Sequence, residues 1–410
     1  MVFWFGQSVS VVGSQITILA LPLTAVMVLG AGPGQMGILG ALSSLPWLVL
    51  GLPAGAWVDR RTRRPIMIGA DLGRFLVLLS VPLSAIAGVL SIELLYAVVL
   101  ATGILTVLST VACQAYLSTL VREGELVDAN SRLELSRSAA QLAGPGLVGI
   151  LVQAVTAPIA ILADALSFAV SAITLTVLKV PEPAPGHSGQ PSLKREIFEG
   201  LTTVLQHPLL RPMVTAMATM NLFVSVGLAA YTVFVVNELG LSAAQIGLVY
   251  SLGGLGFLAG ASGAPIGARR FGLGRTVVAG ALLAGFAEAL IPLAGGPMPL
   301  VLAILVGAQA LNALGVVAAN VNLVSLRQAV TPLWLQGRVA GTSRVLSWGT
   351  FVVGSLVGGL LAETAGLRAT LVVAAVGQVL AVALLFFSPI RSLRDRPHRE
   401  ETGDHGTQPA

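Results

Sequence analysis

The strongest concentration of charge in this 410-residue sequence is a short run in which one acid precedes four arginines, Asp59-Arg60-Arg61-Thr62-Arg63-Arg64. A carboxylate among arginines can form charge-assisted hydrogen bonds, and it can also face the positive N-terminus of a neighbouring helix. Such contacts can be made and broken, so Asp59, Arg60, Arg63 and Arg64 are candidates for a gate. The same arginines could instead only fix the orientation of the chain in a membrane, and both roles are compatible.

Two further pairs of opposite charge could extend this gate. Asp71 and Arg74 lie three positions apart, as do Glu134 and Arg137. Side chains with this spacing meet on one face of a helix. We therefore expect both to form ion pairs, Glu134 with Arg137 where its helix enters the membrane and Asp71 with Arg74 about one to three turns further in.

Two isolated acids, Asp164 and Glu288, lie within apolar runs, and we expect both toward the outer side of the membrane. An ionised carboxylate is costly in an apolar environment, so such a group can carry a proton. Glu288 is the first candidate for proton coupling. Asp164 is the second, although a structural role is the favoured interpretation for it.

Uncharged polar side chains near the middle of apolar runs are the candidates for substrate binding. A buried amide or hydroxyl needs a partner, so these groups either line a cavity or join two helices, and the sequence leaves both open. The candidates are Gln15, Thr17, Asn221, Ser225, Gln309 and Asn312.

The sequence offers little for other chemistry. Cys113 is the only cysteine, and the four histidines are confined to the polar linker and the tail, so neither a disulfide nor a metal site is expected. No cluster pairs a nucleophile with a base, and no phosphate-binding Gly-x4-Gly-Lys-Ser/Thr loop occurs. We expect neither an enzyme nor a cofactor.

The elements that carry these residues are apolar runs of about the length that crosses a bilayer, roughly 20 residues. The chain is 55% hydrophobic and only 10% charged, with a mean hydropathy of +0.89, whereas soluble domains carry about 25% charge. Twelve predicted spans cover residues 3–29, 35–57, 66–88, 94–117, 130–155, 158–178, 212–238, 243–268, 276–294, 300–326, 339–363 and 369–387.

The basic residues are distributed very unevenly about these spans. Twenty-two of the 23 Lys and Arg residues fall on one side, and Arg368 alone falls on the other. This asymmetry predicts a multi-pass protein of the plasma or inner membrane with both termini in the cytoplasm. The lipid bilayer is thus the expected partner. Nucleic acid is not, because the basic residues lie in short loops and not on one soluble face.

The longest polar stretch divides the chain into two halves. We predict a six-helix bundle over 1–178, a cytoplasmic linker with an interfacial helix over 179–211, a second six-helix bundle over 212–389 and a disordered tail over 390–410. The linker helix could equally be an ordinary solvated one. An offset of 209 superimposes Arg60-Arg61 on Arg269-Arg270 and Ser138 on Ser347, which predicts two parallel repeats.

The loop after the second span carries a family resemblance. The stretch from Gly55 to Met67 resembles the loop motif of the major facilitator superfamily. Gly55, Asp59, Arg60, Arg63 and Arg64 match the motif, Thr62 and Trp57 depart from it, and Ala268 replaces the acid in the second copy. The resemblance implies two bundles that alternate access to a central cavity, with a cytoplasmic latch mainly in the first half.

A second resemblance indicates the direction of transport. Gly144, Pro145 and Gly149 resemble a Gly-Pro motif of antiporters in this superfamily, and the strings at 126–130 and 164–168 are similar to the subgroup that includes the enterobactin exporter and macrolide efflux proteins. A helix kink with close packing is the simpler interpretation of the glycines.

The second resemblance implies a monomeric exporter of a small, hydrophobic drug, macrolide, siderophore or other metabolite, with protons as the coupling ion. An importer on the same fold is the alternative. The fourth span lacks the arginine that marks many drug/proton antiporters, so their coupling scheme does not follow.

Overall fold

The computed structural model describes residues 2–51, 53–120, 126–178, 193–332 and 335–394. Within these ranges every regular element is a helix, and eleven helical segments are long and apolar enough to cross a membrane. The predicted all-α, polytopic membrane fold is therefore confirmed.

The first half contains seven α-helices, the first of which ends in a π-helix. These elements are α1 (Val2–Leu23), η1 (Thr24–Val28), α2 (Pro33–Leu50), α3 (Pro53–Asp59), α4 (Arg63–Ile86), α5 (Ile92–Leu120), α6 (Leu126–Val155) and α7 (Ala157–Val177).

The linker contributes one helix and the second half six more, with short 3-10 and π segments. These are α8 (Leu193–Gln206), α9 (Leu210–Val233), η3 (Phe234–Glu238), α10 (Ala243–Phe271), α11 (Leu273–Glu288), η4 (Ile291–Leu293), α12 (Met298–Val330), α13 (Gln336–Thr364), α14 (Leu367–Phe386) and η6 (Pro389–Ser392). The predicted spacer before α8 and the tail beyond Arg394 lie outside the described residues.

The second predicted span is the one that does not form a single long helix. Residues 35–57 are divided between α2 and α3, and Pro53 begins the second piece. Proline has no backbone N–H to donate to the preceding turn, so it cannot continue the hydrogen-bond ladder of α2. The other eleven spans correspond to the eleven helical segments long enough to cross the membrane.

The internal repeat is visible in the helix boundaries, at an offset one residue larger than predicted. Helices begin at residues 33, 63, 126 and 157, and again at 243, 273, 336 and 367, so the offset is 210 and not 209. In both halves the first helix ends in a π-helix, followed by a glycine with positive φ, Gly30 or Gly240.

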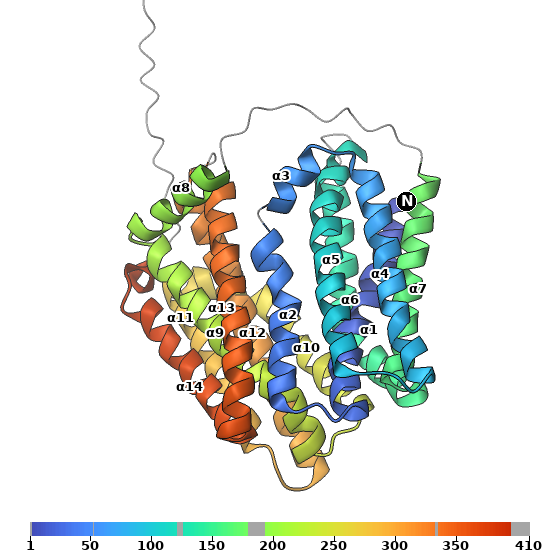
Figure 1. Ribbon diagram of the computed structural model, residues 1–410. Helices are drawn as coiled ribbons and strands as arrows, with labels where there is room; N and C mark the ends of the chain where they lie inside the picture. The colour runs from blue at the N-terminus through green and yellow to red at the C-terminus, as the bar shows by residue number, and fades with distance from the viewer. Residues whose placement is uncertain (1, 52, 121–125, 179–192, 333–334, 395–410) are drawn as a thin grey trace, which may run out of the picture.

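The two bundles stand side by side and meet along two helix pairs, α2 with α13 and α6 with α10 (Figure 1). Each pair crosses at two glycines, Gly37 with Gly359 and Gly149 with Gly247, and the 210 offset relates one crossing to the other. A Cβ on Gly37 would lie 2.9 Å from the Cα of Gly359, and one on Gly149 would lie 2.9 Å from the Cα of Gly247. Only glycine permits this backbone approach.

The close glycine contacts lie near one end of the molecule. Gly37 is in the second turn of α2 and Gly149 in the last two turns of α6. Both positions are remote from the end that carries α3 and α8, which we name the linker end (Figure 1). The two halves are thus held together at the end opposite the linker.

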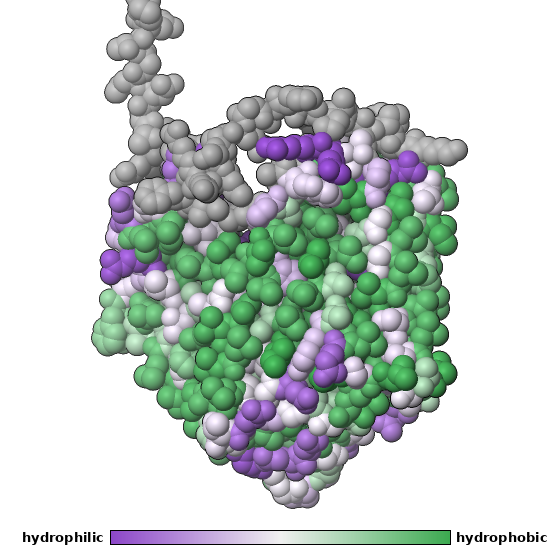
Figure 2. Space-filling view, viewed as in Figure 1, coloured by the Kyte–Doolittle hydropathy of each residue, from purple (hydrophilic) through white to green (hydrophobic). Residues whose placement is uncertain are grey.

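On the face that Figure 2 shows, apolar surface covers the middle of the bundles, and hydrophilic residues gather toward the two ends. Exposed apolar side chains include Leu76, Ile86 and Ile150. A surface of this kind is costly in water and suits contact with lipid tails.

The linker helix α8 packs against the second half. Glu199 forms an ion pair with Arg338 of α13, and Gly200 lies against the carbonyl oxygen of Arg338. The helical part of the linker is therefore attached to the bundle that follows it in the chain.

Candidate functional site: a cavity between the two halves

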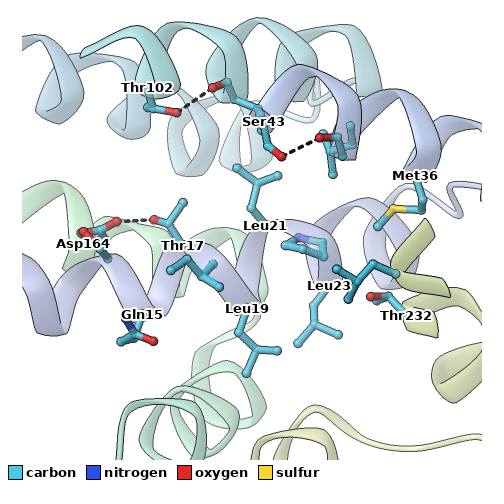
Figure 3. Close-up of a pocket in the computed structure, with 18 of the residues that line it drawn as sticks. Gln15, Thr17, Leu19, Leu21, Leu23, Met36, Ser43, Thr102, Asp164 and Thr232 are labelled. Carbon is cyan, nitrogen blue, oxygen red and sulfur yellow. Dashed lines mark hydrogen bonds between the residues drawn. The ribbon is translucent and has the colours of Figure 1, made fainter. Parts of the chain in front are cut away.

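A cavity of about 630 Å³ lies between the halves, within the range of small-molecule sites. The helices of its wall are α1, α2, α4, α5, α6 and α7 of the first half and α9, η3, α10 and α13 of the second. Most of it is apolar, and Figure 3 shows Leu19, Leu21 and Leu23 of α1 among the lining residues. We name this space the central cavity.

One carboxylate in the wall of the central cavity is held by two hydroxyl groups. Asp164 of α7 is 1% exposed. It accepts hydrogen bonds from Thr17 of α1, as Figure 3 shows, and from the hydroxyl of Ser167, 3.1 Å from Oδ1. A buried carboxylate with neutral hydrogen-bond donors can gain and lose a proton without losing its position.

An arginine joins the same wall. Arg74 of α4 is buried, pairs with Asp71 one turn earlier, and donates from Nη2 to the hydroxyl of Ser109 at 2.9 Å. Its guanidinium lies 4.0 Å from the ring centroid of Phe168, a favourable cation–π contact one turn from Asp164. We name Asp71, Arg74 and Asp164 the charged cluster. Fully ionised, it carries one net negative charge.

Sequence reasoning assigned Asp71 and Arg74 to the gate, whereas the structure places Arg74 at the central cavity. About eleven residues of α4 separate Arg74 from the loop, which carries it roughly 16 Å inward. Arg74 is close to the loop in the sequence, but in the fold it lies in the same cavity wall as Asp164.

A second, smaller space of about 240 Å³ lies within the first half and is mainly polar. Arg74 and Gln15 line both this space and the central cavity. Arg137 and Gln141 of α6, from the direction of the linker end, complete it. We name it the polar pocket, and Arg74 stands between it and the central cavity.

Three predicted binding residues line a third space, of about 440 Å³, between α1, α6, α10 and α12, and Gln15 is one of them. Gln309 and Asn312 belong to its wall. Asn312 also donates to Glu288 Oε2 at 3.2 Å and to the carbonyl oxygen of Ala284 at 3.3 Å. Glu288 is absent from the described lining of all three spaces and is instead bound by Asn312.

The remaining candidates for substrate binding differ in their surroundings. Gln15 lines all three spaces, and Thr17 lines the central cavity. Ser225 is fully buried, donates to the carbonyl oxygen of Leu222 at 2.8 Å, and packs against Gly354 of α13. Neither Ser225 nor Asn221 occurs in the described lining of the three spaces. The Ser225 hydroxyl bonds within α9, and its side chain packs between α9 and α13.

The gate candidates lie at the linker end. Arg64 donates to the carbonyl oxygens of Leu175 and Thr176, at 2.8 and 2.7 Å. It therefore caps the C-terminal end of α7, a helix of its own half. Arg60 is exposed and Arg63 is partly buried. The side chain of Asp59 lies outside the described part of the molecule.

The second charge pair proposed for the gate is found on α6. Glu134 and Arg137 form an exposed pair at 3.6 Å, and Arg137 also reaches the polar pocket. An exposed pair of this kind contributes little to stability.

The Gly-Pro segment of α6 serves close packing. Gly144 lies against the side chain of Gln15, and Gly149 crosses Gly247. Pro145 lines the central cavity, and its carbonyl oxygen also lies close to Gly247. The segment therefore positions α1 and α10 around the cavity.

Aromatic side chains complete the wall. Trp47 of α2 stacks on Trp348 of α13 across the two halves, with ring centroids 5.8 Å apart and an interplanar angle of 14°. Tyr231 and Tyr250 also line the central cavity, and sequence reasoning missed them because no local pattern separates a cavity-facing tyrosine from one that packs between helices.

Two related six-helix bundles around a midplane cavity define a membrane transporter. The family model of the Major Facilitator Superfamily matches residues 3–347. The chain belongs to this superfamily of transporters, as the loop motif predicted.

The chain is similar to two efflux proteins. It is 27% identical over 387 residues to the multidrug efflux pump Tap of Mycolicibacterium fortuitum, covering 92% of both chains. It is 27% identical over 213 residues to macrolide efflux protein A of Streptococcus pyogenes, covering 50% of both.

The fold resembles solved structures of a bacterial homologue of the iron transporter ferroportin. The inward-facing structure superimposes with a TM-score of 0.72 at 19% identity, over 94% of this chain and 97% of the other. A structure described as outward-facing superimposes less well, with a TM-score of 0.59 at 18% identity, over 94% and 98%.

Proposed function

We propose that this protein exports a small, mainly apolar molecule through the central cavity by alternating access, in exchange for protons. The observation that carries the proposal is an apolar cavity between two bundles that holds a single charged cluster. The apolar wall suits a hydrophobic drug, macrolide or similar metabolite. The names of the two efflux relatives support export over import.

The conformation agrees with one stage of such a cycle. The positive-inside distribution of arginines assigns the linker end to the cytoplasm. Contact through Gly37–Gly359 and Gly149–Gly247 then closes the outer end, which corresponds to an inward-facing state. The higher TM-score against the inward-facing ferroportin homologue agrees with this assignment.

Asp164 is the proton site of this proposal, in preference to Glu288. It lines the central cavity, and Arg74 beside it borders the polar pocket that leads toward the linker end. In the inward-facing state Asp164 loses its proton to the cytoplasm and the cavity takes up substrate. In the outward-facing state the substrate leaves and Asp164 is protonated again. Asn312 holds Glu288 outside this route.

The latch completes the cycle in the outward-facing state, in which the linker end closes. Asp59, Arg60, Arg63 and Arg64 then bring charge of both signs to the interface between the halves. Carboxylate–arginine contacts of this kind are directional and reversible.

The test is transport of a fluorescent macrolide or cationic dye into everted membrane vesicles, with and without a collapsed pH gradient. We expect Asp164→Asn to abolish uphill transport while it retains downhill exchange of substrate, because only proton release is lost. Glu288→Gln is the matched control and should keep uphill transport. Uphill transport that survives collapse of the gradient would refute proton coupling, and net movement in the opposite direction would identify an importer.

A further inference from the structure

Three arginines converge on a surface cavity of about 380 Å³ in the second half. Arg275 comes from α11, and Arg391 and Arg394 come from the segment that follows α14. Ser388 and Ser392 add hydroxyl groups to the wall. None of the described residues that line it is acidic, so the described wall carries three positive charges.

This wall is built firmly enough to hold its arginines in place. The backbone N–H groups of Leu273 and Gly274 donate to the carbonyl oxygens of Arg394 and Leu393, at 3.0 and 2.9 Å. Gly274 is in such close contact with Ile390 that a Cβ there would lie 1.8 Å from its carbonyl oxygen. The guanidinium of Arg391 lies 3.9 Å from the ring centroid of Phe386. Arg391 and Arg394 therefore belong to a segment that is held against α11, the helix that carries Arg275.

The location of the cavity points to the membrane boundary. It lies where two spans, α10 and α14, end at Phe271 and Phe386. Phe271 is 60% exposed and Phe387 is 84% exposed. Figure 2 shows hydrophilic surface above the apolar surface at the left edge, where the red C-terminal segment lies in Figure 1. A ligand here would meet positive charge on one side and lipid tails on the other.

We propose that this cavity binds the phosphate headgroup of an anionic phospholipid. Guanidinium groups form paired hydrogen bonds with phosphate oxygens, and the hydroxyl groups of Ser388 and Ser392 can donate to the remaining ones. Phe271 and Phe387 contact the acyl chains at the same boundary. Basic pockets between spans on the cytoplasmic side favour such lipids. Free inorganic phosphate shares the headgroup chemistry, but it has no acyl chains to contact the exposed phenylalanines.

The experiment is native mass spectrometry of the detergent-purified full chain, titrated with phosphatidylglycerol or with phosphatidylcholine of the same acyl chains. Wild type should bind phosphatidylglycerol more tightly. The double variant R391Q/R394Q should weaken that binding by about tenfold or more, since each basic residue near an anionic lipid contributes substantially. R269Q/R344Q removes the same charge from exposed residues of the same half outside the described lining of the cavity, and should leave the preference intact.

Two outcomes would overturn the assignment. Equal weakening by both double variants would mean that diffuse positive charge, and not this cavity, attracts the lipid. A thermal stabilisation by inorganic phosphate equal to that by phosphatidylglycerol would mean that the site takes free phosphate. If R391Q/R394Q melts early without lipid, R391K/R394K replaces it. That variant keeps the charge but loses the paired guanidinium hydrogen bonds, so it should bind phosphatidylglycerol more weakly than wild type.

Discussion

The two halves share their order of spans and four helix starts at an offset of 210, yet they differ in their buried charged residues. Asp71, Arg74 and Asp164 form the charged cluster of the first half. The equivalent positions in the second half are all buried alanines, Ala281, Ala284 and Ala374. A fold made of two copies thus places its ionic chemistry in one of them.

The acid of the second half likewise has no charged counterpart in the first half. Glu288, the acid of the second half, corresponds to Leu78, and its partner Asn312 corresponds to Thr102. Both counterparts line the central cavity, whereas Glu288 is bound by Asn312 away from the described cavity wall. The helix scaffold tolerates either chemistry at these positions, so the repeat determines the frame and single substitutions determine the function.

The largest effect on transport is expected when the charged cluster of the first half is replaced by the alanines of the second. Replacement of Asp71, Arg74 and Asp164 by alanine should give a folded protein without uphill transport, because the second half already packs alanine at these positions. Arg74→Ala alone should lower the stability by about 3–5 kcal/mol, since it leaves buried carboxylates unpaired. Thermal unfolding in detergent measures the stability of the triple variant and of Arg74→Ala, and the vesicle assay measures uphill transport. A triple variant less stable than the single variant would contradict the comparison.

A smaller effect is expected at the symmetric glycine crossings. Gly149→Val would press a side chain against the backbone of Gly247 and so disfavour closure of the end opposite the linker. Overpacking of this kind costs about 1–3 kcal/mol, roughly a tenfold change in the population of the inward-facing state. Spin-label distances across the linker end report this population.

Because the halves are related, Gly37→Val should shift the same distances in the same direction. Gly263→Val is the control, since nothing lies within 4 Å of a Cβ there. A change in the spin-label distances for only one of the two variants would contradict the claim that the related crossings contribute alike to closure.

The smallest effect is expected at His207, which precedes the first helix of the second half. Its Nδ1 accepts hydrogen bonds from the N–H groups of Leu209 and Leu210, at 3.1 and 3.3 Å. Burial lowers the pKa of His207, so the unfolded chain binds the extra proton more readily. Stability should therefore be complete above the unfolded pKa, about 6.5, and fall as the pH drops through the folded pKa.

Melting temperatures between pH 5 and pH 8 measure this dependence. His207→Asn retains an acceptor but does not titrate, and its curve should be flatter than that of wild type. Identical curves for the two proteins would exclude His207 as the titrating group.

Much of the fold was predictable because a bilayer imposes simple rules on a sequence. Apolar length located the spans, and the loop from Gly55 to Arg64 led to the superfamily. The division of the second span at Pro53 was not predicted, since proline is common within other membrane helices, as Pro145 in α6 illustrates.

The candidate site was predicted less completely. Gln15 and Thr17 were recognised from their depth in the first span, and both line the central cavity. Depth along a helix does not give the direction of a side chain, so Ser225 received the same status although it packs against Gly354.

By itself, the sequence determined the membrane class, the superfamily and the division into two halves, because these depend on the length, polarity and order of segments. Only the tertiary structure decided that Asp71, Arg74 and Asp164 share one site, and that Gly37 meets Gly359 while Gly149 meets Gly247. These relations depend on how separate helices rotate and cross, and crossing is set by packing between residues that lie far apart in the chain.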